Sequence, residues 1–193
     1  MVAAEAHGQA WMNLANNISV LRILLVPLFV SALYYYSPEK NYFLPLSIAV
    51  FIFACLTDGV DGYLARKLNQ KTVLGSYLDP IADKLLLLSG FLSLSFMSHL
   101  PPAVRIPAWV TIPVVTRDMI ILIGSTMIFL TTGGLKAQPL FIGKLTTFAQ
   151  MATLFVSLLV APPIIQSVSF VVTVVLTVLS GIQYIRVGGR LMG

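Results

Sequence analysis

Four aspartates within 26 residues are the part of this sequence best suited to chemistry. Asp58 and Asp61 are three residues apart, and Asp79 and Asp83 are four residues apart. On a helix, either spacing puts both side chains of a pair on one face. Four carboxylates that converge between two helices repel one another unless cations lie among them. The spacing therefore predicts a site for divalent metal ions.

Three kinds of site compete to explain these acids. A purely structural network is disfavoured, because four acids offer one another no compensating charge. A cation path through a membrane also uses carboxylates, but these four lie near one end of the flanking apolar runs rather than along a path. Metal-assisted phosphoryl chemistry uses hard oxygen ligands, which select Mg²⁺, Mn²⁺ or Ca²⁺, and needs cations for the phosphate. Arg66, Lys67 and Lys84 supply such cations, so the third kind of site is favoured.

The composition places this site in a membrane protein. Of 193 residues, 58% are hydrophobic and 10% are charged, whereas a soluble domain is about 25% charged. Six apolar stretches are long enough to cross a bilayer as helices: 18–36, 43–65, 79–99, 107–131, 141–160 and 164–185. We predict an all-α integral membrane protein with six transmembrane helices. The net charge of +5 fits anionic headgroups and an anionic substrate rather than nucleic acid.

The same pattern predicts one domain with short ends. Residues 1–17 form an N-terminal segment with a short interfacial helix, 18–187 the six-helix domain, and 188–193 a C-terminal tail. Asp79 resembles an N-cap with Pro80 at the first helical position. The third span is therefore expected to begin there, after a polar loop over 66–77.

The basic residues of the loops orient the bundle. They concentrate between spans two and three, around the loop between spans four and five, and at the C-terminus: Arg66, Lys67, Lys71, Lys136, Lys144, Arg186 and Arg190. Because positive loops stay in the cytoplasm, we predict that the aspartates and both termini face it. The expected location is the inner (cytoplasmic) membrane of a cell, which the chain crosses several times.

Three cationic positions outside the aspartate stretch are candidates for binding an anion. Arg22 either lines a cavity or snorkels from the start of the first span. The pair Arg117-Asp118 lies deep in span four, where an ionisable pair is either functional or a tie between helices. Lys144 opens span five and either binds phosphate or anchors the helix.

The aspartate stretch also carries a longer pattern. The pattern D-x2-D-G-x2-A-R-x8-G-x3-D-x3-D fits without departure, at Asp58, Asp61, Gly62, Ala65, Arg66, Gly75, Asp79 and Asp83. It resembles the signature of the CDP-alcohol phosphotransferase family. This resemblance implies a six-helix bundle that forms a homodimer, with a polar cavity open to the cytoplasm.

The resemblance also implies a role for each of these residues. The metal ligands would be Asp58, Asp61, Asp79 and Asp83, around two ions of Mg²⁺ or Mn²⁺. The CDP group would be bound by Asp58, Gly62, Ala65, Arg66, Gly75 and Asp79. Asp83 would also be the catalytic base: it would deprotonate the acceptor hydroxyl, which attacks the β-phosphorus of the CDP-alcohol and expels CMP. Arg22, Lys84, Arg117 and Lys144 would hold the acceptor's phosphate.

Further segments resemble the branch of the family that uses CDP-diacylglycerol. They are N-L-A-N-x-I-S-x-x-R from Asn13 to Arg22, Thr116-Arg117-Asp118, and G-K-x-x-T-x-x-Q from Gly143 to Gln150. The preferred implication is transfer of a phosphatidyl group to glycerol 3-phosphate. The alternative acceptor is phosphatidylglycerol, as in CMP-forming cardiolipin synthases, where Arg-Asp is common at the position of Arg117-Asp118. A divalent-cation transporter remains the alternative of another class.

Overall fold

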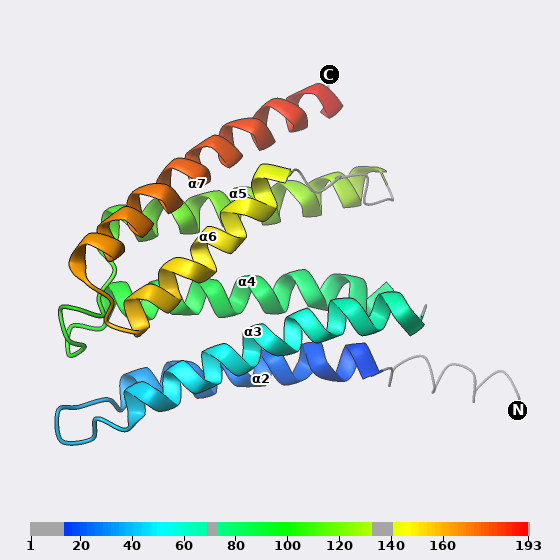
Figure 1. Cartoon of the computed structure of the whole chain (residues 1–193). Coiled ribbons are helices and arrows are strands. Elements are labelled where there is room, and N and C mark those ends of the chain that lie inside the picture. Colours follow the sequence, from blue (N-terminus) through cyan, green and yellow to red (C-terminus); the bar gives the residue numbers. More distant parts are fainter. Residues whose placement is uncertain (1–13, 69–72, 133–140, 193) are drawn as a thin grey trace, which may run out of the picture. The chain divides into compact units, whose positions relative to one another are not determined.

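In the computed structural model, the described part of the chain is helical. The backbone is described for residues 14–68, 73–132 and 141–192, and the side chains for 20–57, 84–124 and 141–186. The helices are α2 (Leu14–Tyr34), α3 (Phe43–Leu68), α4 (Val73–Phe96), α5 (Ala108–Thr132), α6 (Phe141–Leu158) and α7 (Pro163–Met192) (Figure 1). Within the described residues there is no strand, only an isolated bridge between Ser37 and Lys40. The all-α prediction is confirmed for these residues.

The helices divide into two compact units, Met1–Ser93 and Leu94–Gly193, and each is described by itself. In the first unit, α2 packs along α3. Phe29 of α2 and Phe51 of α3 are both buried, with their ring centroids 5.8 Å apart. A buried pair of aromatic rings stabilises the packing of two helices. It fixes the part of α3 that leads into the aspartate stretch.

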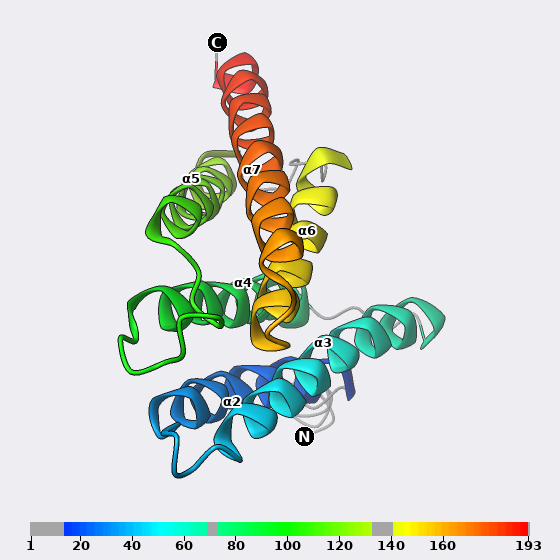
Figure 2. The ribbon, with the colours of Figure 1, turned by 60° about the vertical axis from the view of Figure 1, so that its left-hand side comes forward.

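In the second unit, α7 contacts both α5 and α6 (Figure 2). Trp109 of α5 meets Phe170 of α7 edge to face, with centroids 6.4 Å apart. The hydroxyls of Thr153 on α6 and Thr173 on α7 are 2.7 Å apart. Apolar packing thus joins α5 to α7, and hydrogen bonds of threonine hydroxyls join α6 to α7.

The turn between α6 and α7 ends α6 with a C-terminal cap that has an unusual residue. The N–H of Ala161 bonds to the carbonyl of Val156, and the N–H of Val160 bonds to the carbonyl of Ser157. This is the hydrogen-bond pattern of a Schellman cap, in which glycine is the usual residue at the left-handed position. Here Val160 occupies it with a φ of 53°, a conformation that disfavours a β-branched side chain.

Among the residues that the structure describes, two helices are long and apolar enough to cross a membrane, over Phe141–Leu158 and Pro163–Arg186. Only 33% and 28% of their respective apolar windows are buried, so most of this apolar surface faces outward, as expected for helices in lipid. Three further apolar helical stretches in the described residues are shorter: Val20–Tyr34, Phe43–Thr57 and Lys84–Phe96. The prediction of six transmembrane helices therefore has support at two of them.

The predicted start of the third span is wrong. Helix α4 begins at Val73 rather than at Asp79, so Asp79 is not an N-cap and Pro80 lies inside the helix. Likewise, Arg66 lies in α3, which continues to Leu68, and Gly75 lies in the first turn of α4, so both are helical rather than in a loop. A proline removes only its own N–H from the helical ladder, and helices that cross membranes tolerate it. Pro27 and Pro113 also lie inside helices here.

The first and last helices extend into the segments that were predicted to lie outside the helical domain. Helix α2 begins at Leu14, so the last residues of the predicted N-terminal segment belong to the first helix. The rest of that segment, 1–13, lies outside the described residues, and so does any interfacial helix there. Helix α7 continues to Met192, and the predicted domain boundaries stay a prediction.

Candidate active site

The backbone places all eight residues of the aspartate pattern on two consecutive helices. Helix α3 carries Asp58, Asp61, Gly62, Ala65 and Arg66, and α4 carries Gly75, Asp79 and Asp83. Each pair of aspartates therefore has the helical spacing that puts both members on one face. The side chains of residues 58–83 lie outside the described ones, so the roles expected for them remain predictions.

The two pairs have matching positions along their helices. Asp58 lies ten residues before the end of α3, and Asp83 lies ten residues after the start of α4. At a rise of about 1.5 Å per residue, each is about 15 Å along its helix from the connection 69–72. Asp61 and Asp79 both lie closer to that connection. Each helix therefore carries one aspartate nearer to the connection, Asp61 or Asp79, and one farther from it, Asp58 or Asp83.

The donor chemistry of these residues fits a hard divalent cation. All four are carboxylates, whose oxygens suit Mg²⁺ and Mn²⁺, and no thiol or imidazole occurs between Asp58 and Asp83. Among the described side chains, which exclude these four, no group of three or more His, Cys, Asp and Glu side chains could hold a metal ion. The aspartate stretch remains the candidate for the metal centre.

A second cluster of polar side chains is buried in the second unit, around Arg117 of α5. Arg117 and Asp118 are each only 6% exposed, and Arg117 Nη1 donates to Asp118 Oδ1 at 2.7 Å. Arg117 Nη2 donates to Ser180 Oγ on α7 at 2.5 Å. The third nitrogen, Nε, is buried and has no hydrogen-bond partner. A buried donor without a partner is unfavourable, and an anionic ligand would satisfy it.

Two glycines leave room for the Arg117 side chain between the helices. A Cβ added at Gly143 of α6 would lie 3.4 Å from Arg117 Nη2, and one at Gly181 of α7 would lie 3.7 Å from Arg117 Cγ. The guanidinium therefore lies at the junction of three helices, against the bare backbone of α6. A side chain at position 143 would be in contact with the guanidinium, and one at position 181 with the aliphatic part of Arg117.

The other predicted phosphate-binding residues have different surroundings. Lys144 follows Gly143 on α6 and is exposed, so Arg117 and Lys144 belong to the same end of the second unit. Arg22 on α2 is 1% exposed, and Lys84 on α4 is partly exposed. Both belong to the first unit. Lys144 thus follows the glycine whose backbone lies close to Arg117, whereas Arg22 and Lys84 belong to the first unit.

Sequence reasoning missed Ser180, because a single serine in an apolar helix carries no charge to attract notice. The missed signal is its spacing. Thr173, Thr177 and Ser180 follow one another at intervals of four and three on α7, and all three are buried. On α6, a similar buried face consists of Thr146, Gln150, Thr153 and Ser157. Polar residues at helical spacing inside an apolar span indicate a face turned toward other helices rather than toward lipid.

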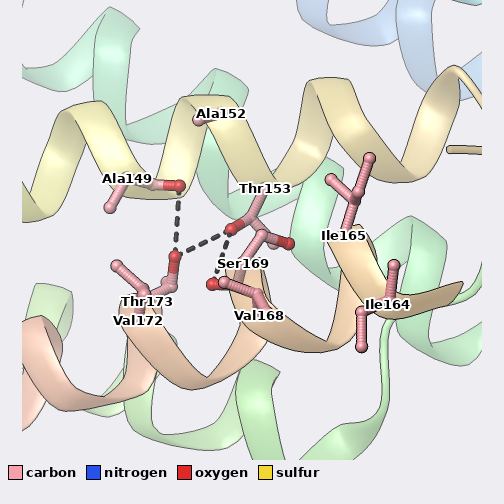
Figure 3. Close-up of a pocket in the computed structure, with 9 residues that line it drawn as sticks. All are labelled: Ala149, Ala152, Thr153, Ile164, Ile165, Val168, Ser169, Val172 and Thr173. Carbon is pink, nitrogen blue, oxygen red and sulfur yellow. Dashed lines mark hydrogen bonds between the residues drawn. The ribbon is translucent and has the colours of Figure 1, made fainter. Parts of the chain in front are cut away.

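A pocket of about 330 Å³ lies elsewhere on the hairpin of α6 and α7 (Figure 3). It is lined by Ala149, Ala152, Thr153, Ile164, Ile165, Val168, Ser169, Val172 and Thr173. Its hydroxyls are already engaged: those of Thr153 and Thr173 lie within hydrogen-bond distance of each other and of the carbonyls of Ser169 and Ala149, respectively. Because no charged side chain lines it, this pocket is not suited to phosphoryl chemistry.

Comparison with known proteins yields a family match over most of the chain. The CDP-alcohol phosphatidyltransferase family matches residues 12–179. A "Probable phosphatidylglycerophosphate synthase" of Mycobacterium tuberculosis (strain ATCC 25618 / H37Rv) is 36% identical over 179 residues, which cover 90% of this chain and 80% of that protein.

Two relatives carry a more explicit name, "CDP-diacylglycerol--glycerol-3-phosphate 3-phosphatidyltransferase". The one from Aquifex aeolicus (strain VF5) is 32% identical over 187 residues, covering 94% of this chain and 98% of the relative. The one from Bacillus subtilis (strain 168) is 34% identical over 188 residues, covering 89% and 93%.

Proposed function

Because the chain belongs to the CDP-alcohol phosphatidyltransferase family, we propose that it transfers a phosphatidyl group from CDP-diacylglycerol to glycerol 3-phosphate, with release of CMP. The products are phosphatidylglycerol phosphate and CMP, and the reaction is a step of phospholipid synthesis. The observation that carries this proposal is the alignment over 187 residues with a relative named for this reaction, which spans 98% of that relative. The two apolar, outward-facing helices agree with an enzyme of a membrane lipid.

In this proposal the donor half of the site is the aspartate pattern of α3 and α4. Asp58, Gly62, Ala65, Arg66, Gly75 and Asp79 bind the CDP group. Gly62 and Ala65 follow Asp58 at intervals of four and seven, so the same face of α3 is small there and leaves room for a nucleotide. Arg66, one residue further, offers a cation to the diphosphate.

Asp83 acts as the general base. It accepts the proton of the acceptor hydroxyl, whose oxygen attacks the β-phosphorus of CDP-diacylglycerol. The bond between that phosphorus and the bridging oxygen breaks, and the electron pair leaves with CMP. Asp83 lies one helical turn beyond Asp79 on α4, a spacing that allows one residue to bind the donor and the next to face the acceptor.

Asp58, Asp61, Asp79 and Asp83 would hold two divalent cations, Mg²⁺ or Mn²⁺. Bound there, the cations would supply stabilisation of charge on the phosphoryl oxygens. The family's dependence on a divalent cation and the all-carboxylate donor set support this proposal.

The acceptor half of the site consists of cationic side chains. The buried Nε of Arg117, which has no partner, supports a phosphate-binding role, because guanidinium and phosphate form charge-assisted hydrogen bonds. Lys144, exposed beside Gly143, would contribute a second positive charge. Arg22 and Lys84 complete the proposed set.

We place this enzyme in the inner (cytoplasmic) membrane as a homodimer with six transmembrane helices in each chain. The active site and both termini face the cytoplasm. The positive charge of the predicted cytoplasmic loops supports the orientation.

The test is an acceptor comparison with purified protein in detergent micelles. With CDP-diacylglycerol and Mg²⁺, labelled glycerol 3-phosphate is expected to enter the lipid fraction, and labelled phosphatidylglycerol is expected to remain unchanged. Conversion of phosphatidylglycerol to cardiolipin, with no use of glycerol 3-phosphate, would favour the alternative acceptor. Flux of divalent metal into liposomes without any CMP release would instead indicate a transporter and would refute the proposed activity.

A further inference from the structure

We propose that Ser180 is a positioning residue, which orients the Arg117 guanidinium so that it binds the phosphate of the acceptor. This inference rests on the proposed function. Ser180 lies one residue beyond the part of the chain that the family match covers. Its importance follows from the contacts of its side chain.

The guanidinium of Arg117 is held at two points. Nη1 donates to Asp118 Oδ1 at 2.7 Å, and Nη2 donates to Ser180 Oγ at 2.5 Å. Asp118 is the next residue of α5, so this contact fixes the guanidinium only relative to its own helix. Ser180 belongs to α7 and fixes the other end of the same planar group. Two contacts at separate nitrogens determine the plane in which a rigid guanidinium lies.

This arrangement leaves a defined edge of the guanidinium available. A guanidinium has five N–H donors, and the two contacts engage one donor on each Nη. The Nε–H has no partner, although the side chain is 94% buried, being only 6% exposed. The edge formed by Nε and a neighbouring Nη is the edge that binds a phosphate in the bidentate manner. Nη2 carries a second N–H besides the one that Ser180 accepts, so Nε and Nη2 together still have two donors for a phosphate.

The choice of serine at 180 suits this role. A hydroxyl oxygen accepts a hydrogen bond without adding a second negative charge beside Asp118, so it does not repel the phosphate. The backbone of α6 passes close by: a Cβ at Gly143 would lie 3.4 Å from Arg117 Nη2 and 4.0 Å from Ser180 Oγ. A side chain at position 143 would therefore touch both members of the pair.

The competing explanation is that the hydrogen bond only ties α5 to α7. The two explanations differ in what its loss changes. A tie between helices affects the stability of the protein and both substrates alike. A positioning contact affects the acceptor and other phosphate ligands of Arg117, and leaves the CDP-diacylglycerol site unchanged.

The experiment compares three variants of the full chain in detergent micelles. Ser180→Ala removes the acceptor oxygen, and Ser180→Thr keeps one. Ser157→Ala is the matched control, because Ser157 is also fully buried but its hydroxyl has no hydrogen-bond partner. Steady-state kinetics are measured against glycerol 3-phosphate and against CDP-diacylglycerol. Inorganic phosphate is used as a competing ligand, and thermal unfolding as a check of stability.

We expect Ser180→Ala to raise the KM for glycerol 3-phosphate about tenfold, the effect of losing one hydrogen bond to a charged group. The inhibition constant of inorganic phosphate should rise in parallel, and the KM for CDP-diacylglycerol should not change. Ser180→Thr should restore both values, and Ser157→Ala should match the wild type.

Two results would overturn the inference while the wild type remains active with glycerol 3-phosphate. One is an unchanged KM for that acceptor in Ser180→Ala. The other is a loss of stability and turnover in which both substrates are affected alike. A wild-type protein that releases no CMP with glycerol 3-phosphate would refute the proposed function itself, and the inference with it.

Discussion

Arg117 of α5 and Ser180 of α7 are joined by a hydrogen bond of 2.5 Å from Nη2 to Oγ, while Arg117 Nη1 contacts Asp118 at 2.7 Å. Both charged side chains are buried. A buried ion pair contributes little net stability when intact, but removal of one partner takes a compensating charge away from the other. Loss of Arg117 alone should therefore lower the stability of the protein more than loss of Arg117 and Asp118 together.

Arg117→Ala is expected to destabilise the protein by about 3–5 kcal/mol, because Asp118 would keep its buried charge without the guanidinium. The double variant Arg117→Ala, Asp118→Ala should recover most of that stability and remain inactive. Thermal or denaturant unfolding in micelles measures the difference. Equal stability of the single and double variants would show that Asp118 does not depend on Arg117.

Asp83→Asn is expected to lower turnover by roughly 10²- to 10⁴-fold, the usual contribution of a general base. The amide is nearly isosteric with the carboxylate but cannot accept the proton of the acceptor. Rates of CMP release at saturating substrates measure the effect. Glu39→Gln is the control, since Glu39 is an exposed carboxylate between α2 and α3. Near-normal turnover in Asp83→Asn would remove Asp83 from the role of base.

Thr173→Val is expected to destabilise the α6–α7 hairpin by about 1 kcal/mol, because interhelical hydrogen bonds in membranes contribute on this scale. Thr173 pairs with Thr153 at 2.7 Å and donates to the carbonyl of Ala149 at 3.1 Å. Thr177→Val provides the comparison: Thr177 is equally buried on the same helix, and its hydroxyl has no partner. Unfolding in micelles should rank Thr177→Val above Thr173→Val in stability, and the reverse order would contradict the hydrogen-bond assignment.

Val160→Gly is expected to stabilise the protein by up to about 1 kcal/mol, because a left-handed conformation is unfavourable for a residue with a Cβ. The φ of 53° at Val160 lies in that region. Val160→Ala keeps the Cβ and should gain less. The melting temperatures of the two variants relative to the wild type test whether the backbone at Val160 is strained. A glycine variant that is less stable than the alanine variant would mean that the capping conformation is not strained.

Sequence reasoning located the helices best where strong terminators surround them. Helix α5 begins and ends within one residue of prediction, between Pro107 and Gly133, and α6 begins at the predicted Phe141. The start of α4 was misplaced, because Asp79-Pro80 has the chemistry of a helix start but lies inside a helix. Local capping preference was overridden there, since a helix in a membrane has no water to satisfy exposed backbone groups and tends to continue.

The candidate site also has residues that could be predicted from the sequence and residues that could not. The proposed donor half could be predicted from the sequence because charged residues in apolar surroundings are conspicuous: Asp58, Asp61, Asp79 and Asp83 lie on helical segments of the described backbone, and their roles stay a proposal. Of the proposed acceptor half, only the charged residues could be predicted from the sequence. Ser180 and Gly181 carry no charge, and their relation to Arg117 depends on how α5 and α7 pack. The contacts between two helices that are far apart in the sequence cannot be predicted from the spacing of residues within either helix alone.

The central claim, phosphatidyl transfer to glycerol 3-phosphate, is tested most directly by the stoichiometry of a single assay. Purified protein is incubated with CDP-diacylglycerol, labelled glycerol 3-phosphate and Mg²⁺, and both CMP and labelled lipid are measured over time. We predict one phosphatidylglycerol phosphate for each CMP, with both products abolished by EDTA and restored by Mg²⁺ or Mn²⁺. Release of CMP without labelled lipid, or equal formation of labelled lipid in EDTA, would contradict the account.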